Sequence, residues 1–73
     1  HDQVLAEVER QRTAFLLHAD TVTADWRTEL ALGDISDDDR AKLSAWMAYK
    51  RAVKAVIEED AIRDGFQWPA IPT

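Results

Sequence analysis

Residues 32–39 read Leu-Gly-Asp-Ile-Ser-Asp-Asp-Asp, and this stretch contains both a helix stop and a helix start. Gly33 stands where a helix commonly ends in a left-handed residue. Ser36 is a favourable N-cap with Asp39 at capping-box spacing, and the acidic run 37–39 suits the positive end of a helix dipole. Because the linker between these two signals is short, the helices on its two sides are expected to pack antiparallel.

The segment before the linker, residues 3–32, contains no Gly or Pro and shows helical periodicity. Its apolar positions recur at steps of three and four, with one skip at Arg12, which we group with the charged residues of the outer face. These apolar positions are Leu5, Val8, Phe15, Ala19, Val22 and Trp26. The β-branched run 21–23 is the weakest part of the pattern, so a bend is most easily placed near residues 18–24. The pattern predicts one helix over about residues 3–32.

The segment after the linker predicts a second helix over about residues 37–60. Its apolar stripe consists of Leu43, Trp46, Val53 and Ile57. Lys50 interrupts the stripe and must either extend its charge to solvent or pair with an acid. Gly65 then stops the helix, and Pro69 forces the residue before it into an extended conformation, so residues 63–73 form an extended Trp-Pro tail. The expected architecture is all-α, with one module over residues 1–73: a hairpin of two long antiparallel helices followed by this tail.

The composition limits the class of protein. The chain has 73 residues, a net charge of −5 and no cysteine, so it forms one domain without a disulfide. For so short a chain, the entropy lost on folding and the apolar surface buried nearly cancel, and a hairpin buries less than a globule does. We therefore expect self-association, with a dimer favoured, or a binding partner. The chain starts at His1 and helical periodicity begins almost at once, so we interpret it as a fragment of a longer protein or as a processed chain. We expect it to be a C-terminal module with a preceding N-terminal domain.

Several function classes are disfavoured. The excess of 14 Asp and Glu over 9 Lys and Arg argues against nucleic-acid binding, and no apolar run is long enough to span a membrane. No Ser/His/Asp or Cys/His grouping and no Gly-rich phosphate loop indicates an enzyme. His18 beside Asp20 lacks a third metal ligand at helical spacing, and the run 37–39 is sufficiently explained as a helix start. We expect no catalytic residue, cofactor or metal, and no nucleic-acid or membrane partner.

The aromatic residues are the best candidates for binding a partner. Trp26 and Trp46 are expected in the hairpin core near the linker, and the alternative is that one of them lines a docking surface. Tyr49 is expected at the core edge with its hydroxyl exposed. The tail can fold back over the helices, which we favour, or bind in trans. The candidates for partner binding or tail docking are Trp46, Tyr49, Lys50, Trp68, Pro69, Ile71 and Pro72.

Two motifs carry a family resemblance. Residues 37–53 read Asp-Asp-Asp-x-x-Lys-Leu-x-x-Trp-x-x-Tyr-Lys-x-x-Val, and residues 66–72 read Phe-Gln-Trp-Pro-Ala-Ile-Pro. This pattern resembles the C-terminal region of the caudoviral tail fibre assembly proteins of phages and prophages, closely over residues 34–72 and only in general helical character before the linker. The chain departs from the family at Lys50, where Arg is usual, and over residues 57–62, which look more helical than the usual turn.

The resemblance implies a chaperone-like function. Proteins of this family assist the folding and trimer assembly of the phage tail fibre, acting at its C-terminal tip in the host bacterial cytoplasm, with retention on the virion as a further option. No catalytic residue transfers, because the family has none. The alternative is a generic helical dimerisation or adaptor module without chaperone activity. The apolar continuity from Leu5 to Trp26 favours this alternative, whereas the Trp-Pro-x-x-Pro ending favours the assembly chaperone.

Overall fold

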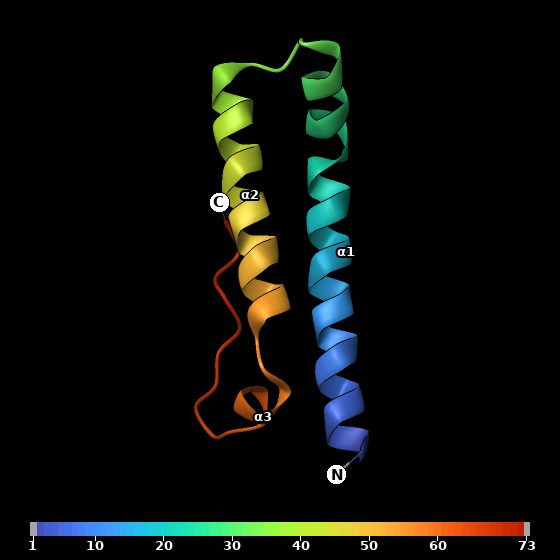
Figure 1. The fold of residues 1–73 in the computed structure, drawn as a ribbon, viewed down its shortest axis with the longest axis vertical. Coiled ribbons are helices and arrows are strands. Elements are labelled where there is room, and N and C mark those ends of the chain that lie inside the picture. The colour runs from blue at the N-terminus through green and yellow to red at the C-terminus, as the bar shows by residue number, and fades with distance from the viewer. Residues whose placement is uncertain (1, 73) are drawn as a thin grey trace.

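The fold is a helical hairpin with a returning C-terminal segment. The computed structural model describes residues 2–72 and contains α1 (Asp2–Leu32), α2 (Asp37–Ala55) and the short α3 (Glu58–Ala61), with no strand among these residues. Figure 1 shows α1 and α2 side by side and antiparallel, with α3 at the end where α1 begins. Residues 66–72 have no regular secondary structure and return along α2. The predicted all-α helical hairpin is confirmed.

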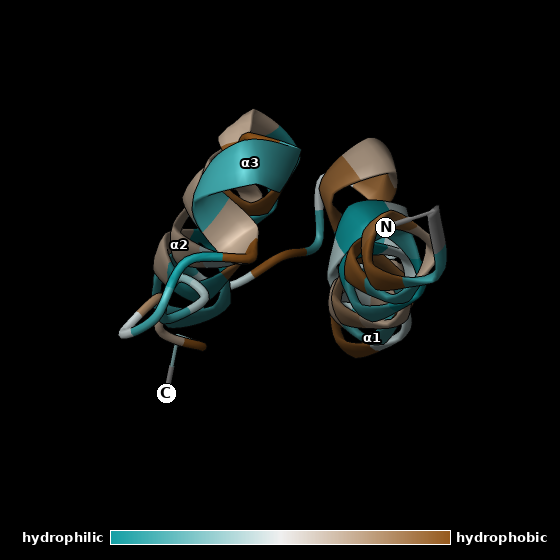
Figure 2. Ribbon diagram, turned by 90° about the horizontal axis from the view of Figure 1, so that it is seen from below, coloured by the Kyte–Doolittle hydropathy of each residue, from teal (hydrophilic) through white to brown (hydrophobic). Residues whose placement is uncertain are grey.

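The hairpin is a single layer of two helices. Its principal extents are 47 × 18 × 15 Å, so the molecule is a rod about as thick as two packed helices. Seen along the rod in Figure 2, α1 and α2 lie next to each other, and α3 continues from α2. Each helix therefore has only one helical neighbour over most of its length, and the seam between them contains the core.

The linker is built by local signals, as predicted. Gly33 has a φ of 79°, its N–H bonds the carbonyl of Leu30 at 3.1 Å, and the N–H of Asp34 bonds the carbonyl of Glu29 at 2.8 Å. These two bonds form a Schellman motif, which satisfies carbonyls that the end of α1 leaves free. Ser36 then caps α2, because its hydroxyl accepts the N–H of Asp39 at 3.1 Å.

The β-branched run in α1 does not interrupt the helix. α1 is continuous from Asp2 to Leu32. The hydroxyl of Thr23 is buried and donates to the carbonyl of Ala19 at 2.8 Å, and that of Thr21 donates to the carbonyl of Leu17 at 3.0 Å. Because the one buried hydroxyl of this run has a partner within its own helix, a threonine can face the seam without an unsatisfied polar atom.

The core lies in the middle of the seam. Ala19 of α1 is buried together with Trp46, Tyr49 and Val53 of α2. The ring of Trp46 meets that of Tyr49 edge-on at 5.6 Å, an arrangement that aromatic pairs favour. Partly buried side chains pack around this cluster: Phe15, Leu16, Val22, Trp26 and Trp68. The expected core positions of Trp26 and Trp46 are therefore confirmed.

The second helix is shorter than predicted. A single helix to about residue 60 is wrong, because α2 ends at Ala55 and α3 is a separate turn. Val56 and Ile57 between them have extended backbones, with φ and ψ of −61° and 127°, and −87° and 134°. In a continuing helix, the carbonyls of Val53 and Lys54 would accept N–H groups four residues on. Here the carbonyl of Val53 accepts the N–H of Val56, only three residues on, at 3.3 Å, and both carbonyls accept hydrogen bonds from Arg12 of α1.

Candidate functional site

Arg12 is the residue that closes the open end of the hairpin. Its Nη1 donates to the carbonyls of Val53 at 2.6 Å and Lys54 at 3.2 Å, and its Nη2 donates to the carbonyl of Val56 at 2.8 Å. Glu9 holds the guanidinium from the side at 3.3 Å. A cation at this place also complements the negative end of the α2 dipole. Arg12 thus caps the carboxyl end of α2 with a guanidinium that the other helix supplies.

Arg12 was placed wrongly from the sequence. We grouped it with the outer charged face, but its side chain is only 13% exposed and faces α2. The available signal was the skip in the apolar stripe, since position 12 falls on the inner face by helical periodicity. A cation at such a position needs acceptors, and the nearest unsatisfied acceptors in a helical hairpin are the last carbonyls of the partner helix.

Three neighbouring side chains of α1 bind the ring of Trp68. The indole Nε1 of Trp68 donates to Oε1 of Gln11 at 2.9 Å. The ring centre lies 5.3 Å from that of Phe15, and the guanidinium of Arg12 lies over the indole at 5.9 Å. We name Gln11, Arg12 and Phe15 the Trp68 site. It combines a hydrogen-bond acceptor, a cation over an aromatic face and a tilted aromatic neighbour.

The predicted candidate residues fall into three environments. Trp46 and Tyr49 are buried in the core, at 7% and 4% exposure. Lys50 is largely buried as well, and its ammonium lies 2.5 Å from a carboxylate oxygen of Asp20. In the C-terminal segment Trp68, Pro69 and Pro72 are half-buried, whereas Ile71 is exposed. The structure therefore brings Trp46, Tyr49 and Trp68 together around one cluster and gives Lys50 a separate role in joining the helices.

The hydroxyl of Tyr49 is not at the exposed edge that we expected. It is buried and has no hydrogen-bond partner within the described part of the protein. Burial raises the pKa of this phenol, because the low-dielectric surroundings disfavour the charged form. A buried hydroxyl without a partner is a local cost in free energy, so this position is a weak point inside an otherwise apolar core.

The ion pair between the helices also changes a pKa. The hydrogen bond from Lys50 lowers the pKa of the Asp20 carboxyl, and the positive charges of Lys50, Arg27 and Lys54 act in the same direction, against partial burial. Asp20 remains half-exposed, so solvent weakens this interaction. The pair mainly fixes the register of two helices whose apolar stripe Lys50 would otherwise interrupt.

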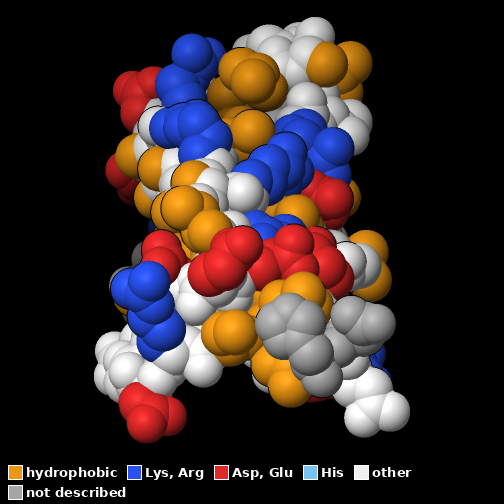
Figure 3. Space-filling model, turned by 60° about the horizontal axis from the view of Figure 1, so that its bottom comes forward, with side chains coloured by type: hydrophobic (Ala, Val, Ile, Leu, Met, Phe, Trp, Pro, Cys, Tyr) orange, Lys and Arg blue, Asp and Glu red, His pale blue; other side chains and the backbone are white. Residues whose placement is uncertain are grey.

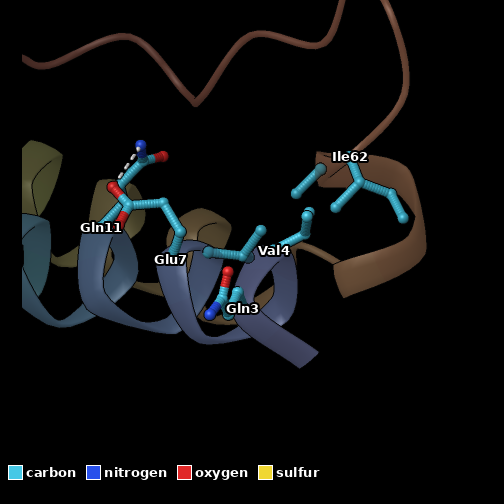
Figure 4. A pocket seen from close by; sticks show the side chains of 7 residues that line it. Gln3, Val4, Glu7, Gln11 and Ile62 are labelled. Atoms are coloured by element: carbon cyan, nitrogen blue, oxygen red, sulfur yellow. Dashed lines mark hydrogen bonds between the residues drawn. The ribbon is translucent and has the colours of Figure 1, made fainter. Parts of the chain in front are cut away.

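An open groove adjoins the Trp68 site. It encloses about 350 Å³ between the first turns of α1 and the residues that follow Glu59, and Figure 4 shows Val4 and Ile62 on its two sides. Its lining residues are Gln3, Val4, Glu7, Val8, Gln11, Ala61 and Ile62. Figure 3 shows exposed apolar side chains at this end of the molecule with acidic side chains beside them. Gln11 belongs to both the groove and the Trp68 site.

The described residues offer no arrangement typical of metal chemistry or membrane insertion. Between residues 2 and 72, no three His, Cys, Asp or Glu side chains are grouped so that they could hold a metal ion. Within the same range, no helix has the length and apolar character needed to cross a bilayer. What the site does offer is apolar and aromatic surface with a few hydrogen-bonding groups.

Comparison with known proteins identifies the family. A family model described as Caudovirales tail fibre assembly protein, lambda gpK, matches residues 1–73, the whole chain. The chain belongs to this family. The resemblance seen in the two sequence motifs is thereby confirmed, and the match extends it over α1. A search of curated proteins and a search of solved structures gave no match.

Family membership supports a role in phage tail fibre assembly. The family is one of assembly proteins and not a known class of enzymes. The motif residues have visible structural roles: Trp46, Tyr49 and Val53 form the α2 side of the core, and Trp68 closes over it. Gln11 and Arg12, which receive Trp68, lie outside both motifs, and sequence reasoning missed them as a binding surface.

Proposed function

We propose that this chain is an assembly chaperone for a phage tail fibre, which assists folding and trimerisation of the fibre through protein–protein contacts. The observation that carries the proposal is the family match over all 73 residues. Fibres rich in long-range β pairing fold slowly and expose apolar edges on the way. A helical partner with exposed apolar surface can cover such edges, and the proposed place of action is the host cytoplasm, where the fibre is synthesised.

The exposed apolar surface supports this function physically. Val4, Ile57 and Ile62 are 49%, 58% and 40% exposed at the open end of the hairpin, next to the groove. Ile71 in the C-terminal segment is 48% exposed. We propose that Pro69, Ile71 and Pro72 contact the fibre, at its C-terminal tip. Trp68 docks this segment on α1, while Trp46, Tyr49 and Lys50 hold the hairpin that presents it.

A second candidate function is self-association without chaperone activity. The same exposed apolar residues, Val4, Ile57 and Ile62, favour it, because they remain exposed at one end of the hairpin. We propose a homodimer through this end of the hairpin. The two functions are compatible if a dimer presents two fibre-binding segments, so the assay must separate dimer loss from chaperone loss.

Co-production with the cognate fibre tests the proposal. The fibre is produced alone, with this protein, and with the variants Ile71→Ala and Leu17→Ala, and the yield of soluble trimeric fibre is measured by size-exclusion chromatography with light scattering. Leu17 is the matched control, because it is an exposed apolar residue of α1 outside the core cluster and the groove. We expect trimer yield to rise with the protein and to fall with Ile71→Ala only. An unchanged yield with and without the protein would refute the chaperone function.

A further inference from the structure

The C-terminal segment is held by side chains alone. The last backbone hydrogen bond before the end of the described residues is that from the N–H of Phe66 to the carbonyl of Arg63, at 3.2 Å. Among the described residues, the backbone of residues 67–72 neither donates nor accepts a hydrogen bond. The attachment therefore depends on Trp68, whose indole sits in the Trp68 site with a tilted contact to Phe15. Phe66, within the segment itself, lies edge-on to Trp68.

The stretch preceding Trp68 is suited to act as a hinge. Gly65 has a φ of 81°, and no atom lies within 4 Å of the place where a Cβ would stand. Residues 62–65 are exposed and form turns without side-chain bonds to α1 or α2. A segment that is joined through an exposed turn and anchored by one indole ring can leave its site without disturbing the helices.

The Trp68 site selects a particular kind of ring. The amide nitrogen of Gln11 donates to Oε1 of Glu7 at 3.3 Å, which leaves the carbonyl oxygen of Gln11 to accept a bond from the occupant. Arg12 supplies a cation for an aromatic face. The occupant that satisfies both groups is an aromatic side chain that also donates a hydrogen bond, namely Trp or Tyr. Because the site makes no backbone contact, it accepts such a ring from any extended polypeptide.

When Trp68 occupies the Trp68 site, the adjoining groove stays unfilled by the C-terminal segment and a buried hydroxyl stays without a hydrogen-bond partner among the described residues. The groove shares Gln11 with the Trp68 site and continues from it past Glu7 to Val4 and Ile62, yet the C-terminal segment does not line it. Tyr49 belongs to the cluster that Trp68 packs against, and its buried hydroxyl has no partner among the described residues. An incoming polypeptide that fills both the Trp68 site and the groove gains contacts that the protein's own segment does not make.

These features together indicate how a partner binds, on the basis of the proposed function. We propose that the Trp68 site is the client-binding site, that Trp68 occupies it as an internal ligand, and that an extended fibre segment carrying a Trp or Tyr displaces Trp68 and continues into the groove. The tethered segment competes at an effective concentration in the millimolar range. It thereby excludes weak ligands and yields only to a polypeptide that uses the groove as well.

A peptide-binding experiment tests this proposal without a fibre. The probe is a fluorescein-labelled peptide with the sequence of residues 63–72, whose fit to the site the structure shows, and binding is followed by fluorescence anisotropy. The receptors are the full-length wild type, Trp68→Ala, and Gln67→Ala as the matched control next to it, since Gln67 is exposed and its side chain makes no hydrogen bond to another described residue. We expect Trp68→Ala to bind the probe at least tenfold more tightly than the wild type and Gln67→Ala do.

Two results would overturn the proposal. Folded Trp68→Ala that does not bind the probe at about 1 mM, the scale of the effective concentration of a tethered segment, would show that the site receives no polypeptide in trans. Equal binding by all three receptors would show that Trp68 does not occupy the binding site. A probe with Trp replaced by Ala should not bind any receptor, and binding by this probe would count against an aromatic site.

A second measurement covers the case in which Trp68→Ala does not fold. The indole Nε1–H signal of Trp68 in the wild-type NMR spectrum is assigned by its loss in Trp68→Phe, and unlabelled probe is then added. We expect the chemical shift of this signal to change towards that of a solvent-exposed indole. An unchanged chemical shift at saturating probe would overturn the proposal. A wild-type dimer that Trp68→Ala converts to a monomer would overturn it too, because the natural occupant would then be the segment of a second copy.

The test separates this inference from the function on which it rests. If the probe fails to bind while co-production still raises the yield of trimeric fibre, the protein is an assembly chaperone that contacts its client elsewhere. If the probe binds as expected but fibre yield does not change, the site is real and the proposed function is wrong.

Discussion

Replacing Arg12 by alanine removes a residue that joins α1, the end of α2 and the C-terminal segment. Its bonds to the carbonyls of Val53 and Val56, at 2.6 and 2.8 Å, are partly buried, and each is worth about 1–1.5 kcal/mol because the donor is charged but the site is only partly dry. The contact with Trp68 adds about 0.5–1 kcal/mol. The exposed 3.2 Å bond to Lys54 adds little, since water can replace it. Arg12→Ala should therefore lower the free energy of unfolding by about 3 kcal/mol.

The assay is urea denaturation followed by far-UV circular dichroism and by tryptophan fluorescence. Arg10→Ala is the matched control, because Arg10 is two residues away on the same helix, is 76% exposed and, among the described residues, pairs only with Glu7. Its loss should cost less than about 0.5 kcal/mol. Arg12→Lys keeps the charge but not the planar fork of donors, so it should recover less than half of the loss. Equal unfolding midpoints for Arg12→Ala and Arg10→Ala would refute the assignment of Arg12 as the cap of α2.

Three other substitutions each test a single contact. Trp46 is 7% exposed at the centre of the core, so Trp46→Ala should cost about 3–5 kcal/mol and abolish helical circular dichroism at room temperature; retained helicity would contradict its role. Removing the partnerless hydroxyl in Tyr49→Phe should leave the urea midpoint unchanged or raise it, by up to about 1–2 kcal/mol of stability, and a clear loss would show that the hydroxyl has a partner. The pKa of Asp20 is lowered in the folded state from an ordinary value of 3.8, so its pairing with Lys50 stabilises the fold fully above that value, and the contribution disappears as pH falls through the lowered pKa. Asp20→Asn should thus lower the urea midpoint at pH 7 more than at pH 2, and equal losses at both would contradict the pairing.

The features that could be predicted from the sequence are those specified by neighbouring residues. Gly33 and Ser36 each act within one turn of their own position, and the structure has both the Schellman bonds and the cap at these residues. The apolar stripe of each helix is likewise local, because periodicity along one helix identifies the face that needs a partner. Helix existence, hairpin topology and the burial of Trp46 could all be derived on this basis.

The features that could not be predicted depend on residues far apart in the sequence. The end of α2 at Ala55 was missed because Arg12, 41 residues before Val53, takes the carbonyls that a longer helix would use. The helix propensity of residues 56–60 gives no information about the hydrogen bonds from Arg12 to these carbonyls. The Trp68 site was missed for the same reason, since Gln11 becomes an acceptor for an indole 57 residues away only when the tail has folded back. The Tyr49 hydroxyl was placed wrongly because its burial depends on how the seam packs.

The contrast between the two ends of the rod has a consequence for the order of folding. At the linker, Gly33 and Ser36 hold the backbone by bonds that span no more than five residues, so this turn can form early and at little cost in entropy. At the other end, the hydrogen bonds of Arg12 to Val53 and of Trp68 to Gln11 join residues more than forty positions apart in the sequence. They can form only after the helices have aligned. The two helices should then pair progressively from the linker, and the end that contains the groove should pair last. The proposed client-binding site would then lie in the part of the structure that opens most readily.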